Sequence, residues 1–200
     1  MQYPAFFDSV PRLKMRDPLA GFLGACQDGL IEYSYLDVVK LAGHSCPTVA
    51  SAYWMTHQSL HVLYGDEIPE RGTIRVEFKE DLLTGVTGVI ANVISMLTGA
   101  TSDTGFKGLA GRYDRRNLLF FNADIPGEIR FTRPDSGAKF DVLTNLRNVP
   151  GDPEMLELMQ RSLRGDASQA ETERFGVMWQ ERVHRILLEH GNDAEIFVIR

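Results

Sequence analysis

The feature that most constrains this chain is a short turn followed by a long apolar helix. The turn comprises residues 43–47 and reads Gly-His-Ser-Cys-Pro. Pro47 favours the first position of a helix, so Cys46 is the expected N-cap, and Gly65 is a natural residue to follow the last turn. The sequence therefore predicts a helix from Pro47 to about Tyr64. Much of its apolar surface comes from Ala50, Tyr53, Trp54, Leu60 and Leu63.

Helix and strand signals alternate along the rest of the chain. Helices are expected after Asp17-Pro18, after the capping box of Ser34 and Asp37, over 86–97, from Asp152-Pro153 to about Arg164, and after the capping box of Ser168 and Glu171. Strands are expected at 29–33, 73–78, 117–122, 128–133 and 139–143, while 195–199 is either a last strand or a partner-binding arm. Pro126-Gly127 suggests that 117–122 and 128–133 form a β-hairpin.

This order predicts an α+β fold with helices packed on a mixed β-sheet. The character of the sequence changes after Asn148, where the strand signals give way to two amphipathic helices. We therefore expect a core of residues 1–148 and a C-terminal helical extension of residues 149–200.

Charge and cysteine content limit the classes of function. The chain has 200 residues and a net charge of −6, which argues against nucleic acid as the main partner. It shows neither a signal-peptide pattern nor an apolar run of about 20 residues, so we expect a cytoplasmic protein with no membrane partner. Its two cysteines, Cys26 and Cys46, are too few for a four-cysteine zinc site. A metal site would have to draw on histidine, carboxylates or a second protein chain.

The Gly-His-Ser-Cys-Pro turn has the residue types for metal or thiol chemistry. A helix N-terminus favours the thiolate form of a cysteine, and His44 lies two residues away. Nitrogen and sulfur donors together suit zinc or another borderline to soft divalent ion. The structural alternative is a simply buried cysteine in a turn that occurs by chance. A disulfide between Cys26 and Cys46 is also left open by the sequence.

The turn, the helix after it and a second segment together resemble a known family. The second segment, residues 94–101, reads ISMLTGAT and leads into a glycine-bearing loop and the 117–122 strand. Over roughly residues 30–135 this order is similar to the FmdE family, the formylmethanofuran dehydrogenase component of that name and its bacterial relatives. The resemblance implies a mixed α+β core, often dimeric, with a metal near the His-x-Cys pair. Some members of that family accompany a molybdenum or tungsten enzyme of one-carbon metabolism.

Only His44 and Cys46 carry over as metal ligands, with Cys46 also the candidate catalytic residue. The chain departs from the family pattern at Ala42, where a first histidine is frequent, and at Ala100, which replaces a cysteine. The usual cysteine-rich zinc-finger tail is also absent. A family site that uses a second cysteine therefore cannot be complete in this chain.

Two functions follow as hypotheses. The first is a metal-binding protein, linked to oxidoreductase or one-carbon metabolism, in which His44 and Cys46 bind a divalent metal, zinc by preference. A carboxylate, water or substrate would complete that site. The alternative is a non-catalytic interaction or dimerisation subunit with a decayed metal site. Its extension, residues 149–200, would then dock a second copy, giving a homodimer, or an enzyme-complex partner.

Other polar groups are weaker candidates for a metal or anion site. His57 and His61 share one helical face, as in two-histidine metal sites, although such pairs are common on amphipathic helices. A cluster of carboxylates could supply a third ligand or simply face solvent at a turn. The glycine-rich loop of 99–111 could cradle an anion or be a plain loop, and a short basic cluster follows it. The carboxylates are Glu77, Glu80 and Asp81, the cationic side chains of the loop are Lys107 and Arg112, and the basic cluster is Arg112, Arg115 and Arg116 around Asp114.

Overall fold

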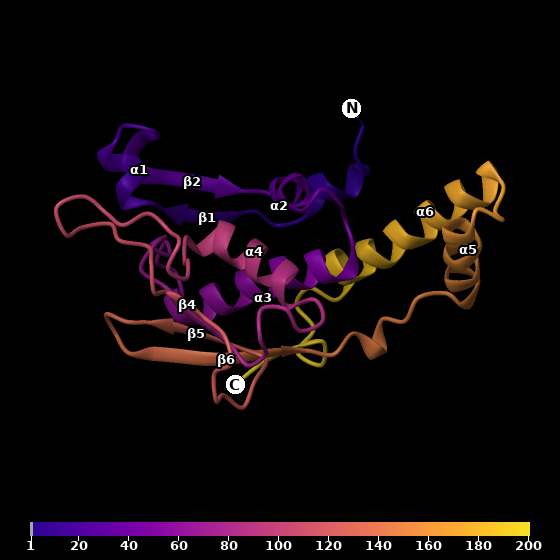
Figure 1. Cartoon of the computed structure of the whole chain (residues 1–200). Coiled ribbons are helices and arrows are strands. Elements are labelled where there is room, and N and C mark those ends of the chain that lie inside the picture. The colour runs from indigo at the N-terminus through magenta and orange to yellow at the C-terminus, as the bar shows by residue number, and fades with distance from the viewer. Residues whose placement is uncertain (1) are drawn as a thin grey trace.

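The computed structural model describes residues 2–200 and shows three stacked layers (Figure 1). The first layer is the antiparallel hairpin of β1 (Leu13–Arg16) and β2 (Leu30–Tyr33), with α1 (Pro18–Phe22) at its turn and α2 (Tyr35–Ala42) after it. The middle layer holds α3 (Pro47–Tyr64) and α4 (Thr87–Thr98). The third layer is a five-stranded sheet. Its strands are β3 (Arg75–Phe78), β4 (Leu119–Phe120), β5 (Ile129–Arg133), β6 (Ala138–Thr144) and β7 (Phe197–Ile199). The predicted α+β fold with a mixed sheet is confirmed.

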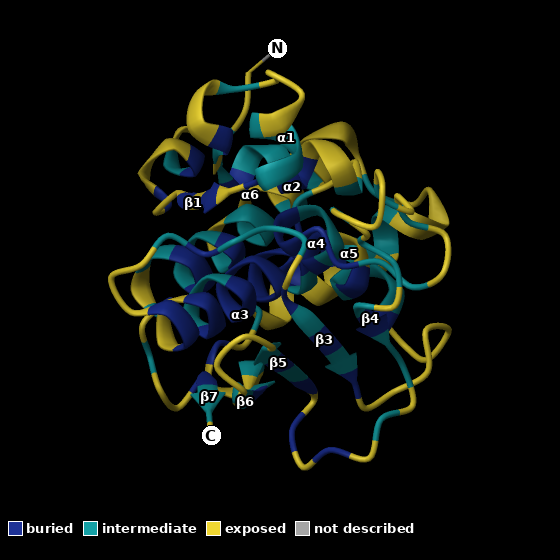
Figure 2. Cartoon of the chain, turned by 90° about the vertical axis from the view of Figure 1, so that its left-hand side faces the viewer, coloured by how far each residue is buried: buried dark blue, intermediate teal, exposed yellow. Residues whose placement is uncertain are grey.

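Helix α3 is the centre of the molecule. It begins at Pro47 and ends at Tyr64, as predicted, and Gly65 follows it with a positive φ of 57°. Thirteen of its 18 residues are buried, because the hairpin layer covers one side and the sheet covers the other (Figure 2). A helix that is buried over most of its surface needs apolar or small residues on most faces, which is why no single stripe dominates its sequence. The helix therefore anchors the Gly-His-Ser-Cys-Pro turn to the core.

The sheet has the order β4-β3-β5-β6-β7, in which β3 and β4 are parallel and the other neighbours are antiparallel. The predicted hairpin between 117–122 and 128–133 is therefore wrong, since β3 lies between β4 and β5. The eight-residue connection from 121 to 128 is too long for a tight turn, and it carries the chain across β3. The tight hairpin is instead the next one, β5–β6, which turns at Pro134–Gly137.

The C-terminal extension forms a helical hairpin and then returns to the sheet. Helices α5 (Pro153–Arg164) and α6 (Gln169–His184) start at the predicted caps, and together they project from the body as an arm (Figure 1). After a π-helical turn at Arg185–Glu189, the chain ends in β7, which pairs with β6. The last segment is thus a strand, and the division into two parts at residue 148 stays a prediction.

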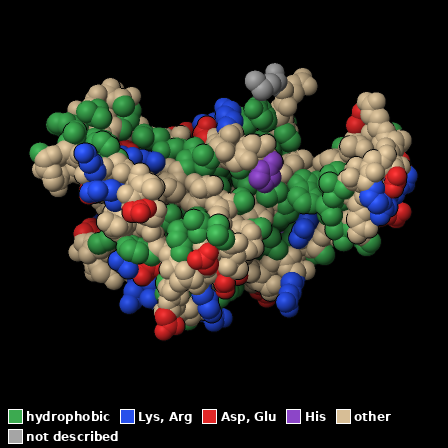
Figure 3. All heavy atoms as spheres, viewed as in Figure 1, with side chains coloured by type: hydrophobic (Ala, Val, Ile, Leu, Met, Phe, Trp, Pro, Cys, Tyr) green, Lys and Arg blue, Asp and Glu red, His purple; other side chains and the backbone are tan. Residues whose placement is uncertain are grey.

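The surface seen in Figure 3 mixes basic and acidic side chains, and hydrophobic side chains gather where the arm joins the body. Within residues 2–200 no helix combines the length and the apolar character that a membrane span requires.

Candidate functional site

The predicted site residues lie at the N-terminus of α3, and each has a defined local role. Cys46 is the N-cap residue, and its Sγ accepts a hydrogen bond from the Val49 amide at 3.4 Å. The thiol is largely buried, with 8% of the residue exposed. His44 is exposed, and its Nδ1 lies 2.9 Å from the carbonyl oxygen of Ala42. A ring nitrogen facing a carbonyl must carry the proton, so the Nε2 of neutral His44 keeps its lone pair.

Helix α6 holds the peptide between these two residues. The carbonyl oxygen of Ser45 accepts hydrogen bonds from Trp179 Nε1 at 3.0 Å and from Gln180 Nε2 at 3.1 Å. The hydroxyl of Ser45 lies 3.0 Å from Gln180 Oε1 and 3.0 Å from the hydroxyl of Tyr35. Burial raises the pKa of Tyr35, so this phenol stays protonated as a hydrogen-bonding partner. The turn is thus fixed by side chains from α2 and from the C-terminal extension.

Within residues 2–200, no group of three or more His, Cys, Asp and Glu side chains is placed to hold a metal ion. His44 and Cys46 therefore have no third donor beside them among the described residues. Both cysteines are free thiols, so the structure contains no Cys26–Cys46 disulfide. The described residues thus do not form a closed four-ligand zinc site, and metal binding by His44 and Cys46 stays a prediction.

The second histidine pair does not add to this site. His61 is exposed, whereas His57 packs its ring 5.0 Å from that of Trp54. Burial lowers the pKa of His57 below its ordinary value of 6.5, and the neighbouring His61 lowers it further. Its Nδ1 is buried with no hydrogen-bond partner among the described residues. His57 is thus a half-buried side chain whose neutral form is favoured.

The carboxylates near the end of β3 have local structural partners. Glu77 pairs with Arg75 at 2.9 Å. Asp81 accepts from the Leu83 amide at 2.9 Å and from Asn122 Nδ2 at 3.0 Å, and these bonds lower its pKa. These contacts favour the interpretation of a solvated turn over that of a third metal ligand.

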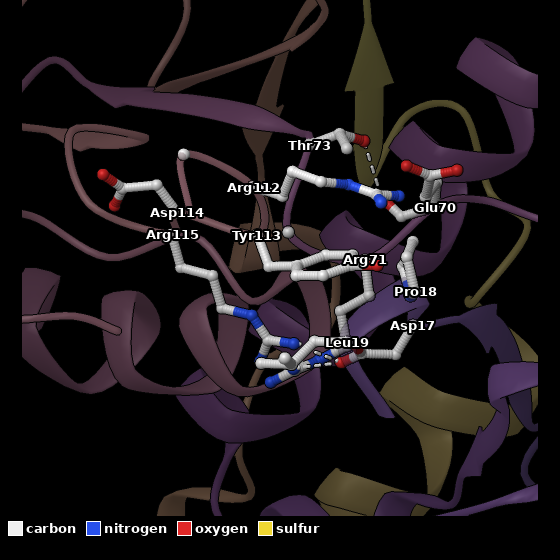
Figure 4. Close-up of a pocket in the computed structure, with 12 residues that line it drawn as sticks. Asp17, Pro18, Leu19, Glu70, Arg71, Thr73, Arg112, Tyr113, Asp114 and Arg115 are labelled. Atoms are coloured by element: carbon white, nitrogen blue, oxygen red, sulfur yellow. Dashed lines mark hydrogen bonds and ion pairs between the residues drawn. The ribbon is translucent and has the colours of Figure 1, made fainter. Parts of the chain in front are cut away.

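A pocket that sequence reasoning missed lies on another side of the molecule (Figure 4). Its volume is about 550 Å³, and three separate segments line it: 17–19 at the start of α1, 70–73 before β3, and 111–115 in the loop before β4. The sequence shows only a scattered set of charges in these segments. Their convergence depends on the antiparallel β1–β2 hairpin, of which the sequence predicts only the second strand.

One side of this pocket is a nearly buried ion triad. Asp17 is 2% exposed and caps α1 through the Ala20 amide at 3.0 Å. Arg71 Nη1 reaches its carboxylate at 2.8 Å, and Arg115 Nη2 lies 2.7 Å from both carboxylate oxygens. Burial alone would raise the pKa of Asp17, but the amide and the two guanidinium groups outweigh it and lower the pKa. One carboxylate thus forms ion pairs with two arginines.

The other side of the pocket comes from the loop of the predicted glycine-rich segment. Leu109 and Arg112 exchange backbone hydrogen bonds at 2.8 and 2.9 Å around Ala110-Gly111. Ala110 and Tyr113 have positive φ values of 48° and 62°, which are strained for residues with a side chain. Of the two cations considered for an anion cradle, Arg112 lines the pocket and Lys107 does not.

Two comparisons with known proteins bear on the family of this chain. No family model matches the chain, and no curated protein sequence matches it. Membership of the FmdE family therefore stays a prediction that rests on the residues of the turn and of 94–101.

Proposed function

We propose that this protein binds a divalent transition metal ion, zinc by preference, through His44 Nε2 and the Cys46 thiolate. The observation that carries the proposal is the hydrogen bond between His44 Nδ1 and the Ala42 carbonyl oxygen. Metal-binding histidines usually donate their other ring N–H to a carbonyl or carboxylate in this way, which fixes the tautomer and orients the ring. The exposed ring of His44 then offers Nε2 to an incoming ion.

The position of Cys46 supports the same role. Its Sγ already accepts the Val49 amide at the N-terminus of α3, where the helix dipole favours negative charge. Binding of a metal would stabilise the deprotonated sulfur further. Because this chain supplies two donors, water, a small ligand or a second protein molecule must supply the others. Such an open site suits a role beside an oxidoreductase or in one-carbon metabolism, where the metal would polarise a small substrate.

Elemental analysis of untagged protein tests this proposal. We expect near-stoichiometric metal in the wild type, and its loss in folded His44→Ala and Cys46→Ser. His61→Ala and Cys26→Ser are matched controls that remove the same chemical groups elsewhere, and they should keep the metal. Titration with Co²⁺ adds a direct readout, since a sulfur-to-cobalt charge-transfer band reports thiolate ligation. Absence of metal from the wild type, or equal loss in the controls, would contradict the proposal.

A second candidate function is assembly, with a second copy of this chain as the partner. The arm of α5 and α6 carries large hydrophobic side chains in solvent: Leu163 is 80% exposed, Val177 is 69% exposed and Leu156 is 48% exposed. Val177 also borders a shallow groove of about 780 Å³ between α6 and the N-terminal residues Pro4 and Phe6. Exposed apolar surface of this kind often marks an interface.

Sedimentation or light scattering of charge variants tests the assembly role. Leu163→Glu and Val177→Glu should shift a dimer towards the monomer. Leu83→Glu is the control, because Leu83 is 89% exposed but lies outside the arm. A wild-type protein that is monomeric at all concentrations would remove this candidate and leave the metal-binding proposal untouched.

A further inference from the structure

The pocket of Figure 4 is lined by charged groups that the fold leaves unpaired or only partly paired. Asp17 is the only acid bound to Arg71 and Arg115 among the described residues, so the buried triad keeps one net positive charge. Arg71 uses all three of its side-chain nitrogens, because its Nε and Nη2 also donate to the Met96 carbonyl oxygen at 3.1 and 2.9 Å. Arg115 is not saturated, since its Nε and Nη1 donate to no other residue of 2–200.

The backbone is shaped to leave this guanidinium accessible. Gly72 has a φ of 88°, and a Cβ at this position would lie 3.3 Å from Arg115 Nε. A larger residue would therefore crowd the nitrogen that has no partner. The Arg115 side chain is 16% exposed, so it is reachable from the pocket while most of it is out of water. Electrostatic attraction is stronger at such a partly buried position than at the surface.

Arg112 supplies a second free cation on the strained loop. Its guanidinium lies 5.0 Å from the centre of the Tyr113 ring, and it forms no ion pair in the described chain. The neighbouring Arg116 differs, because Asp114 binds it through two hydrogen bonds at 3.0 and 2.7 Å. The carboxylate of Glu70, which also lines the pocket, likewise has no hydrogen-bonding partner within residues 2–200.

We propose that this pocket binds a small organic anion that joins a carboxylate or phosphate to a neighbouring hydroxyl or ammonium donor. Arg112 and the free edge of Arg115 meet the anionic group, and guanidinium groups suit both oxyanions. Glu70 accepts from the donor, which selects such molecules over simple anions. The volume of about 550 Å³ lies in the range of pockets for small molecules. This site is separate from the metal-binding proposal, and neither depends on the other.

The test is a titration of the full chain followed by amide chemical shifts, at constant ionic strength. The probes are glycolate, acetate and inorganic phosphate, so that carboxylate and phosphate recognition are separated. We expect saturable shifts at Gly72, Arg112 and Tyr113, with glycolate bound more tightly than acetate. Arg112→Ala should weaken binding about tenfold or more, as expected for a hydrogen bond to a charged group.

Two further variants keep the proposal falsifiable. Lys107→Ala removes a positive charge from the same loop but should change affinity less than about twofold, because Lys107 does not line the pocket and solvent screens its charge. Glu70→Gln should reduce the preference for glycolate over acetate. The proposal is overturned if no probe gives saturable shifts at these residues, or if Arg112→Ala and Lys107→Ala weaken binding equally.

Discussion

The His44–Cys46 turn and the Asp17–Arg115 pocket differ in how their polar groups are used. In the turn, the Ser45 hydroxyl and carbonyl have partners on α2 or α6, and the Cys46 sulfur accepts a backbone amide. In the pocket, a buried carboxylate is shared by two arginines, and Arg112 and Glu70 are unpaired within the described chain. The turn is rigid but poor in donors, whereas the pocket is rich in charge that the fold does not neutralise.

This difference shows that a recognisable sequence motif and a concentration of unpaired charged side chains need not coincide. Local signals such as an N-cap and a helix-starting proline produce the turn within a few residues. The pocket needs three segments far apart in the sequence, and it leaves Arg112 and Glu70 without a partner among the described residues. Unsatisfied charge of this kind is typical of functional sites.

The variant with the largest expected effect is Asp17→Ala, which tests whether the buried ion triad stabilises the pocket. This change leaves Arg71 and Arg115 together without a counter-charge, and we expect a loss of about 3–5 kcal/mol in the free energy of unfolding. Urea denaturation measures it. The control is Asp114→Ala, which breaks an ion pair at an exposed position and should cost less than about 1 kcal/mol. Similar losses in the two variants would mean that the buried triad does not hold the pocket together.

The elements around both regions were predictable to different degrees. The bounds of α3, the cap of α1 at Asp17 and the capping boxes of α2 and α6 follow from local hydrogen bonds, so they can be read from a few residues. The pairing of β4 with β3 depends instead on a long connection across the sheet, and local turn signals favoured the wrong hairpin.

In the candidate sites, too, local features could be predicted from the sequence and long-range contacts could not. The role of Cys46 as a helix cap could be read from Pro47, and the structure confirms it. The contacts of Trp179 and Gln180 with Ser45 could not be predicted, because they join residues more than 130 positions apart. The sequence signal for the pocket was the basic cluster at 112–116. From the sequence alone, surface charge is the simpler interpretation of that cluster. In the folded chain, however, Arg115 forms a buried ion pair with Asp17.

Gln180→Ala tests whether the turn depends on the C-terminal extension. The variant loses both hydrogen bonds with Ser45, and we expect unfolding to become easier by about 1–3 kcal/mol. If His44 and Cys46 bind metal, the same variant should bind it more weakly, because the peptide between the ligands is released. Gln169→Ala on the exposed start of α6 is the control. An unchanged stability would show that Trp179 alone fixes the turn.

His57 lies on α3, the helix that Cys46 caps, and it should make the stability of the protein depend on pH. Burial lowers its folded-state pKa below the value near 6.5 of the unfolded chain. As the pH falls below about 6.5, the unfolded chain gains this proton first, so stability drops until the folded group also titrates. His57→Gln should remove this part of the acid sensitivity, whereas exposed His61→Gln should remove only the smaller share that the charge of His61 contributes. Stability measured between pH 7 and 5 gives the result, and equal pH profiles for the two variants would exclude a neutral, buried His57.

The smallest expected effect is the change in stability caused by Arg112→Ala. This variant tests whether Arg112 serves ligand binding rather than folding. Arg112 is exposed and forms no ion pair in the described chain, so its loss should change the free energy of unfolding by less than about 0.5 kcal/mol. The ion triad of Asp17, Arg71 and Arg115 stabilises the walls of the pocket, whereas Arg112 lines the space between them. A stable variant with impaired anion binding would show that its charge serves a ligand. A marked loss of stability would instead place Arg112 with the triad, as part of the scaffold.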